Sequence, residues 1–396
     1  MTTAHHFPLE GLDHCPFIPV FGPPPVMFER GSGTELFDVD GKRYLDFLCG
    51  IAVTSLGHSH PAVADAIAEQ ARTLMHVSNF FANPVAARAA VLVDELLGGG
   101  GQVFFCNSGA EANEAALKLA RRYGGRGRHV VVSALGSFHG RTLATLAATG
   151  QPAKHEPYQP LPEGFRHVPY GDIEALTAAI DPTVAAVLLE PLQGEGGVIP
   201  APDGYLAAVR TLCDERGLLF IVDEVQTGFA RTGRWFGFEH SGVRPDVVTL
   251  AKGMGNGMPV GGVWARREVA ASFRPGDHGS TFSGTAIATA AVCAVIDEMR
   301  RIDAPSLAVR RGSELREALA AVPGVVSIRG WGLLLGVELD PAYLRGRTAG
   351  DVTKELLGKG LVVNAVTGSA LRLAPPITVS SDEIAQAAQL IAEVLA

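Results

Sequence analysis

Lys252 and Asp223 are two residues whose types and positions could support chemistry. Lys252 directly follows the apolar run Val247–Ala251, and Asp223 directly follows a second run, Leu218–Val222. Runs of this composition are typical of buried strands. In open α/β sheets, ligands bind at the carboxyl ends of the strands, where both side chains would lie. An unpaired ammonium group is costly to bury, so the lysine needs a partner or a chemical purpose.

Two interpretations account for this pair. A lysine amine condenses with an aldehyde cofactor, and an aspartate beside a pyridine nitrogen keeps it protonated, so that the ring accepts electrons from a substrate carbanion. The alternative is a buried ion pair between Asp223 and Lys252 without catalytic meaning. The two positions alone leave both interpretations open.

A third feature is a candidate phosphate-binding turn. The apolar run Val103–Cys106 leads through Ser108–Ala110 into a helix predicted over Glu111–Tyr123. We expect the inward face of this helix to carry Ala112, Ala115, Ala116, Leu119 and Tyr123. Free backbone N–H groups at a helix start, with the Ser108 hydroxyl, can cradle a phosphate. Alone, the turn is an ordinary helix cap; beside a lysine and an aspartate it supplies the third group that pyridoxal 5′-phosphate needs.

The elements that must position these residues form an α/β pattern. Apolar runs alternate with helical patterns, as expected for a mainly parallel sheet buried on both faces. The runs are Val103–Cys106, Val130–Ser133, Ala185–Glu190, Leu218–Val225, Val247–Ala251 and Gly261–Ala265. Before these runs, Asp40-Gly41 predicts a hairpin. After them, strands are predicted at Gly332–Leu339 and Leu371–Leu373. A last helix is predicted to start at the capping box formed by Ser380 and Glu383.

The length of the chain predicts more than one domain. Its 396 residues exceed the roughly 250–300 at which a single core stops growing. We expect a large cofactor-binding domain over residues 51–295. A small α+β domain would combine both chain ends, residues 1–50 and 296–396.

Composition and charge argue against several classes of protein. A net charge of −8 without a basic block gives no footprint for nucleic acid. No uncharged apolar stretch reaches the roughly 18 residues that suggest a membrane span, and the first residues lack a secretory signal, so we expect a soluble, cytoplasmic protein. His5-His6 is typical of a tail rather than a metal site. The cysteines are scattered, which indicates reduced thiols: Cys15, Cys49, Cys106, Cys213 and Cys293.

Three segments together resemble the class-III pyridoxal-phosphate aminotransferases. They are Phe105–Ala112 (FCNSGAEA), Asp223–Gly228 (DEVQTG) and Leu250–Gly253 (LAKG). The family's motif order is kept from about Gly31 to Pro376. The resemblance implies pyridoxal-phosphate fold type I, as in aspartate aminotransferase, a transaminase activity, and a homodimer with shared active sites.

The resemblance implies a role for each cofactor-binding position. Lys252 would form the Schiff base with the cofactor and then move the proton of the 1,3-shift, while Asp223 would pair with the ring nitrogen. The phosphate would be held by Ser108, Gly109 and Ala110, together with Thr281 of the neighbouring subunit. Val225 and Phe138 would contact the two faces of the ring. Gln226 would contact the ring hydroxyl.

The resemblance also implies how substrates bind, and the planar fork of arginine suits carboxylates. Arg372 resembles the arginine that grips the α-carboxylate of glutamate or 2-oxoglutarate, and Arg141 the one that grips the far carboxylate. Glu195 resembles a gate that masks Arg372 while an ω-amino donor binds and moves aside for glutamate. Ile51 and Ser280 complete the predicted substrate-binding residues.

Within the family, the acetylornithine branch is the most similar. The resemblance rests on Gly50–Val53, Gln193–Ala201 and Gly276–Phe282. It implies that the enzyme moves the ω-amino group of N²-acetylornithine to 2-oxoglutarate by a ping-pong route, as in arginine biosynthesis. Ile51 stands where ornithine δ-aminotransferases carry a tyrosine. Beside Phe80 and Phe81 it predicts an apolar pocket for an acylated amine.

Several alternatives stay open at this stage. The chain departs from the family pattern at Ala82, Asn256 and Thr285-Ala286. Donors of the 4-aminobutyrate, succinylornithine, ornithine or acetyl-lysine type therefore remain candidates. A glutamate-semialdehyde aminomutase shares the cofactor motifs but lacks the gate glutamate, so Glu195 argues against it. A non-catalytic pyridoxal-phosphate module finds no support, because no basic patch or DNA-binding extension is present.

Overall fold

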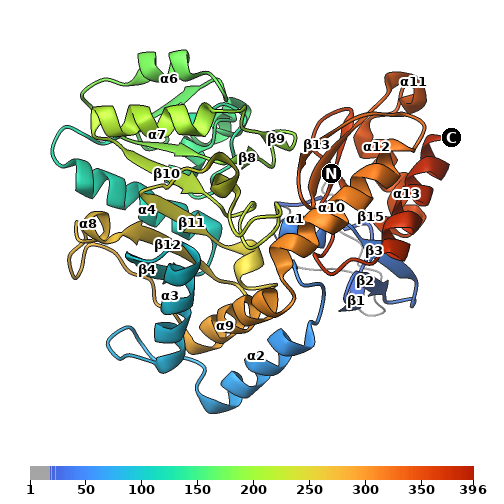
Figure 1. Cartoon of the computed structure of the whole chain (residues 1–396), viewed down its shortest axis with the longest axis horizontal. Coiled ribbons are helices and arrows are strands. Elements are labelled where there is room, and N and C mark those ends of the chain that lie inside the picture. The colour runs from blue at the N-terminus through green and yellow to red at the C-terminus, as the bar shows by residue number, and fades with distance from the viewer. Residues whose placement is uncertain (1–17, 19, 23) are drawn as a thin grey trace.

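The computed structural model describes residues 18, 20–22 and 24–396. His5-His6 and Cys15 lie outside the described residues. Figure 1 shows a large sheet with its helices beside a smaller group of strands and helices, in which blue elements from the start of the chain meet red elements from its end. The predicted domain boundaries stay a prediction.

The larger part is built on a seven-stranded sheet with the order β4-β12-β11-β10-β7-β5-β6. β12 pairs antiparallel with β4 and β11, and the other neighbours pair parallel. The strands are β4 (Gly101–Cys106), β5 (Val130–Ala134), β6 (Phe165–Val168), β7 (Val184–Leu189), β10 (Leu219–Asp223), β11 (Val247–Leu250) and β12 (Gly261–Arg266). The predicted mainly parallel α/β sheet is confirmed. β6 was not predicted, because it is a partly exposed edge strand that contains Arg166 and His167.

Helices lie on both sides of this sheet (Figure 1). The helices of this part are α2 (Pro61–Thr73), α3 (Pro84–Leu96), α4 (Gly109–Gly124), α5 (Leu143–Ala148), α6 (Ile173–Ala179), α7 (Tyr205–Arg216), α8 (Arg267–Ala270) and α9 (Ala286–Arg301). Among them, α2 packs against α9. The alanines and leucine predicted for the inner face of α4 are buried, but Tyr123 is 44 % exposed. The prediction for Tyr123 is wrong: this residue lies in the last turn of the helix and is not covered.

The smaller part contains two four-stranded sheets. The order β1-β2-β3-β15 joins strands from both ends of the chain, and β13-β14-β17-β16 comes from the carboxyl-terminal part. Their strands are β1 (Phe28–Ser32), β2 (Glu35–Asp38), β3 (Arg43–Asp46), β13 (Val325–Trp331), β14 (Leu334–Leu339), β15 (Leu361–Val362), β16 (Asn364–Ala365) and β17 (Ala370–Leu373). The predicted hairpin is confirmed: Phe37 pairs with Arg43, and Gly41 turns with φ 81°.

The remaining helices of this part are α1 (Cys49–Ala52), α10 (Ala304–Ala320), α11 (Pro341–Leu344), α12 (Ala349–Gly358) and α13 (Ser381–Leu395). Of these, α10 and α12 pack on the strands, and α13 packs on α10 and α12. The predicted capping box is present at the start of α13, where Ser380 and Glu383 bond each other's backbone N–H groups. Two short strands, β8 (Leu192–Gln193) and β9 (Ile199–Pro200), form a ribbon that contacts β13.

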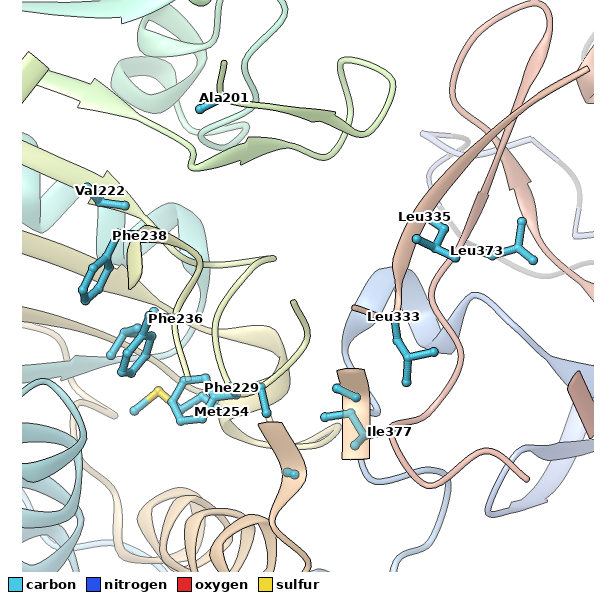
Figure 2. Close-up of a cluster of buried hydrophobic side chains, with 14 of the residues drawn as sticks. Ala201, Val222, Phe229, Phe236, Phe238, Met254, Leu333, Leu335, Leu373 and Ile377 are labelled. Atoms are coloured by element: carbon cyan, nitrogen blue, oxygen red, sulfur yellow. The ribbon is translucent and has the colours of Figure 1, made fainter. Parts of the chain in front are cut away.

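One hydrophobic cluster connects the two parts (Figure 2). Phe229 and Phe236 beside the large sheet belong to the same cluster as Leu333 and Ile377 of the smaller part. The fully buried Arg231 reinforces this junction, because its guanidinium donates to the Leu333 carbonyl at 3.2 Å and to the Pro375 carbonyl. This packing fixes β17, and with it Arg372, relative to the large sheet.

Two further features concern the described part of the chain. None of its helices is long and apolar enough to cross a membrane, and it contains no group of side chains with the arrangement of a metal site. Cys49, Cys106, Cys213 and Cys293 are buried free thiols.

Candidate active site

A cavity of about 380 Å³ lies at the carboxyl ends of β4, β10 and β11. Its size is that of a pocket for a small ligand. Most of the predicted site residues line it: Ser108, Gly109, Ala110, Phe138, Arg141, Glu195, Asp223, Val225, Gln226 and Lys252. These residues come from segments far apart in the sequence, and the crossovers of the parallel sheet bring them to one edge.

Lys252 projects from the turn that follows β11. Its φ of 47° lies in the left-handed region, which non-glycine residues adopt at some cost. Burial and the positive charge of Arg372 together lower the pKa of the Lys252 amine to about 8, although the carboxylates of Glu195 and Asp223 act to raise it. A lysine with this pKa has a substantial neutral fraction near pH 7, and the neutral amine is the nucleophilic form.

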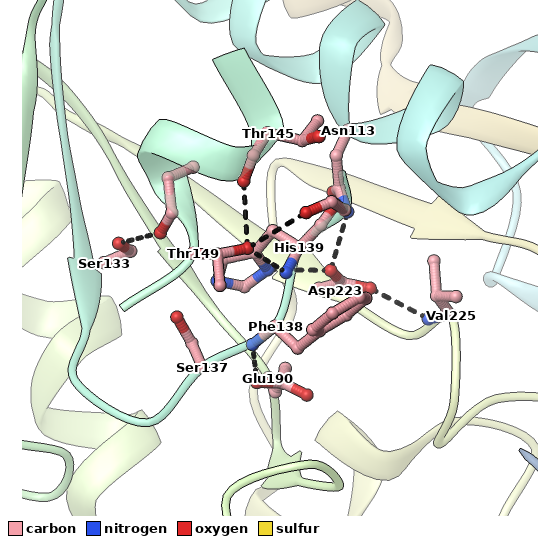
Figure 3. A network of polar contacts seen from close by, with 12 residues as sticks. Asn113, Ser133, Ser137, Phe138, His139, Thr145, Thr149, Glu190, Asp223 and Val225 are labelled. Carbon is pink, nitrogen blue, oxygen red and sulfur yellow. Dashed lines mark hydrogen bonds and ion pairs between the residues drawn. The ribbon is translucent and has the colours of Figure 1, made fainter. Parts of the chain in front are cut away.

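Asp223, the last residue of β10, is held by three hydrogen bonds (Figure 3). Its Oδ2 accepts bonds of 2.8 Å from Asn113 Nδ2 and from His139 Nδ1, and its Oδ1 accepts one of 3.0 Å from the Val225 N–H. The carboxylate is only 3 % exposed. Donors on both oxygens fix the orientation of the carboxylate at the cavity wall.

The start of α4 forms one end of the cavity. Ser108 is the N-cap, and its hydroxyl accepts a hydrogen bond from the Glu111 N–H at 3.2 Å. The N–H groups of Gly109 and Ala110, in the first turn, have no acceptor within the helix. A Cβ atom on Gly109 would lie 2.8 Å from Val225 Cγ1, so glycine is needed for this close approach. The geometry suits a phosphate group next to a ring that lies on Val225.

Phe138 and Val225 both line the cavity, as expected for residues that hold the two faces of a flat ring. Phe138 is fixed through its backbone N–H, which donates to Glu190 Oε2 at 3.1 Å. Glu190 is buried at the end of β7, and burial raises its pKa to about 7. Its other oxygen accepts from the Gly194 N–H at 3.4 Å, so this one carboxyl contacts both the Phe138 loop and the loop of Glu195.

Arg372 and Glu195 form an ion pair at the wall of the same cavity. Their Nη1 and Oε1 atoms are 2.5 Å apart, and Arg372 also donates to Gln226 Oε1 at 3.3 Å and to Asn364 Oδ1 at 3.1 Å. Burial opposes ionisation of Glu195, but the charge and hydrogen bond of Arg372 lower its pKa overall. Arg372 is fully buried, and its Nη2 has no partner within the described chain. A substrate carboxylate can bind at such a place, because Arg372 has a free buried donor and the Glu195 carboxylate beside it can move away.

Three predicted residues do not line the cavity within one chain. Thr281 is exposed, and Ser280 accepts a 2.9 Å hydrogen bond from Asn107 Nδ2 through its hydroxyl. Ile51 is 36 % exposed and belongs to a turn of left-handed backbone. Phe80 is 93 % exposed, and the expected grouping of Ile51 with Phe80 and Phe81 stays a prediction.

Asn113, His139 and Glu190 are residues of the site that sequence reasoning missed. Asn113 and His139 act on Asp223 from α4 and from the loop after β5, and Glu190 ends the predicted strand run. The signals were weak but present: His139 adjoins Phe138, and Asn113 lies four residues after Gly109, one turn along the helix face.

The cavity fits pyridoxal 5′-phosphate on features of this chain alone. It offers an amine of lowered pKa for an aldehyde, free N–H groups at a helix start for a phosphate, and an oriented carboxylate for a ring nitrogen. The amine is that of Lys252, the N–H groups are those of Gly109 and Ala110, and the carboxylate is that of Asp223. All of these residues line one pocket.

The lowered pKa of Lys252 predicts how cofactor uptake depends on pH. Only the neutral amine attacks an aldehyde, and with a pKa of about 8 the neutral fraction rises nearly tenfold per pH unit until about pH 8 and then levels off. We expect the rate at which the cofactor-free protein develops visible absorbance with pyridoxal phosphate to follow this curve in stopped-flow mixing. Pyridoxal without its phosphate serves as a control for titration of the phosphate. A rate still rising tenfold per unit near the ordinary lysine pKa of about 10.4 would contradict the assignment.

Comparisons with known proteins agree with this geometry. Residues 20–395 match the model of the family described as aminotransferase class-III. The acetylornithine aminotransferase of Corynebacterium efficiens is 50 % identical over 390 residues, which cover 95 % of this chain and 94 % of that protein.

Two solved structures are similar over most of the chain. The ornithine aminotransferase of Toxoplasma gondii superposes with a TM-score of 0.88 at 34 % identity, over 94 % of this chain and 90 % of that one. The N-acetylornithine aminotransferase of Stenotrophomonas maltophilia K279a gives 0.82 at 32 % identity, over 94 % and 96 %. The chain belongs to the class-III aminotransferases, and it is a transaminase whose cofactor is pyridoxal 5′-phosphate.

Proposed function

We propose that this transaminase moves the ω-amino group of N²-acetylornithine to 2-oxoglutarate, giving N-acetylglutamate 5-semialdehyde and glutamate. The observation that carries the proposal is the Arg372–Glu195 pair in the cavity of Lys252. Proteins named acetylornithine aminotransferase, at 50 % and 47 % identity over nearly the whole chain, support the choice of donor. A place in arginine biosynthesis and in the cytoplasm follows from the same proposal.

The residues of the chain divide the work of amino transfer. Bound pyridoxal 5′-phosphate supplies an aldehyde that takes up the amino group and a ring that accepts electrons. Lys252 Nζ would hold the aldehyde at rest and, as a free amine, would serve as the group that takes up and returns a proton. Asp223, oriented by Asn113 and His139, would hold the ring nitrogen and favour a positive charge on it.

The ion pair of Arg372 explains how one cavity serves two substrates. With Glu195 in place, Arg372 is neutralised, and an ω-amino donor cannot bind by its α-carboxylate. When glutamate or 2-oxoglutarate binds, its α-carboxylate replaces Glu195 and takes up the spare Nη2 donor. Glu195 is the more exposed partner, with 29 % of its side chain accessible against 1 % for Arg372, so it is the partner that moves. A glutamate-semialdehyde aminomutase needs no such gate.

We also propose a homodimer in which the two subunits share their active sites. An apolar surface formed by Met75, Phe80, Phe81 and Phe282 is exposed, with Phe80 at 93 % and Phe81 at 68 %. Two contacts connect its segments: His76 lies 5.4 Å from the Phe282 ring, and Asn79 Nδ2 donates to the Ser280 carbonyl at 3.1 Å. Large exposed apolar patches mark interfaces, and Thr281 on this surface would then reach the phosphate site of the other subunit.

Replacing two phenylalanines of this surface tests the dimer. We expect Phe81→Ser with Phe282→Ser to shift the protein from dimer to monomer in analytical ultracentrifugation, and to weaken cofactor retention at least about tenfold, because Thr281 is lost from the partner's site. Val91→Ser with Val326→Ser, at two other exposed apolar positions, serves as the control. A wild-type protein that sediments as a monomer, or a mutant that stays dimeric and keeps its cofactor, would contradict the proposal.

The donor is tested by comparing amines on the purified holoenzyme. With 2-oxoglutarate as acceptor, we expect the highest kcat/KM for N²-acetylornithine, above succinylornithine, ornithine, 4-aminobutyrate and N²-acetyllysine. Ornithine should be poor because Ile51 offers no polar partner to its charged α-amino group. A higher kcat/KM for any other amine would assign the enzyme to that donor instead.

A further inference from the structure

Lys154 and Arg141 both lie near the ring of Phe138, which lines the active-site cavity. The Lys154 ammonium nitrogen is 5.4 Å from the centre of the Phe138 ring, and the guanidinium carbon of Arg141 is 5.5 Å from the same centre. Phe138 and Arg141 line the cavity. Two cations from different segments therefore approach the one aromatic ring that we expect to hold the cofactor.

The position of Lys154 is fixed by a chain of contacts. It ends the short 3₁₀ helix Pro152–Lys154, and its ammonium donates to the side-chain oxygen of Gln151. The Gln151 amide in turn donates to the Ser137 carbonyl at 2.9 Å, next to Phe138. Lys154 is only partly exposed, so its long side chain does not extend freely into solvent.

Within residues 24–396, no carboxylate forms an ion pair with Arg141 or Lys154. The carboxylate that acts on Lys154 is that of Glu195, which is already paired with Arg372. Burial lowers the pKa of Lys154, and the charge of Arg141 lowers it further, as expected for two like charges that await an anion.

We propose that Lys154 acts together with Arg141 to bind the substrate carboxylate remote from the reacting amine. This inference rests on the proposed function, since both substrates then carry such a group: the α-carboxylate of N²-acetylornithine and the γ-carboxylate of glutamate. Arg141 supplies a planar fork and Lys154 a compact point charge. Lys154 thereby selects donors and acceptors with an anionic far end, and it acts in both half-reactions, whereas Arg372 acts only on the α-carboxylate of glutamate and 2-oxoglutarate.

Replacing Lys154 with methionine tests this role. We expect Lys154→Met to raise KM for N²-acetylornithine and for 2-oxoglutarate in parallel, by about tenfold or more, with kcat changed less than about twofold. Lys154→Arg should restore most of the affinity. Lys354→Met, which removes an exposed lysine of α12, should leave both constants unchanged.

A substrate without the remote carboxylate separates recognition from structure. N-acetyl-1,4-diaminobutane is N²-acetylornithine without that group, and its kcat/KM should be the same for wild type and Lys154→Met. Equal losses for both amines would make Lys154 merely structural, and an unchanged KM for both carboxylated substrates would overturn the proposal. If the wild type rejects N²-acetylornithine while KM for 2-oxoglutarate still depends on Lys154, the proposed donor is wrong and the carboxylate site stands.

Discussion

Lys252→Ala is expected to abolish the visible absorbance of the holoenzyme and to lower kcat for amino transfer at least about 10⁴-fold. Lys252 is the amine of lowered pKa in the cavity, and it faces the groups expected to hold the phosphate and the ring nitrogen. The variant loses both the covalent attachment of the cofactor and the base that moves the proton. Absorbance spectra and steady-state rates measure the two losses separately.

The fold of the variant should be retained. Burial disfavours the charged form of Lys252, so its removal costs little stability. Lys118→Ala, which removes a lysine that contacts the Asp277 carbonyl on the exposed side of α4, is the matched control and should keep full colour and activity. A coloured Lys252→Ala protein, with the cofactor bound covalently elsewhere, would contradict the assignment.

Arg372→Ala should raise KM for glutamate and 2-oxoglutarate by about 10²-fold while changing KM for N²-acetylornithine less than about fivefold. The α-carboxylate would lose its buried partner in the cavity. The ω-amino donor does not use Arg372 in this account. Single-turnover measurements of the two half-reactions give the separate constants.

Because Arg372 is fully buried, Arg372→Lys serves as a second variant that keeps the charge but loses the planar fork. Arg372→Lys should also raise KM for glutamate and 2-oxoglutarate more than KM for N²-acetylornithine, but by less than Arg372→Ala does. Arg311→Ala removes an arginine that pairs with Glu314 far from the cavity and should leave both half-reactions unchanged. Equal losses in the two half-reactions of Arg372→Ala, at unchanged thermal stability, would count against the gate.

Much of the fold could be predicted because its strands are buried on both faces. Such strands read as continuous apolar runs, which is why Val130–Ser133 and Val247–Ala251 anticipated β5 and β11. β6 lacked this signal because an edge strand tolerates polar side chains. The N-cap of α4 and the capping box of α13 could be predicted from the sequence, because their residues form hydrogen bonds with close neighbours in the chain.

The site could be predicted only where strand ends or a known motif defined it. Asp223 and Lys252 follow apolar runs, so topology alone placed them at one edge of the sheet. Asn113 and His139 could not be predicted, because their role depends on how α4 and the loop after β5 approach β10 in space. The grouping of Ile51 with Phe80 stays a prediction, because the sequence does not tell which subunit supplies each wall of a shared pocket.

The most direct test of the account is a single turnover of each half-reaction on one preparation of holoenzyme. Mixed with N²-acetylornithine and no acceptor, the enzyme should lose the absorbance of its lysine-bound cofactor and release one N-acetylglutamate 5-semialdehyde per subunit. Added 2-oxoglutarate should restore the absorbance and yield one glutamate per subunit. An unchanged spectrum with N²-acetylornithine, or semialdehyde formed without later recovery by 2-oxoglutarate, would contradict the proposed reaction.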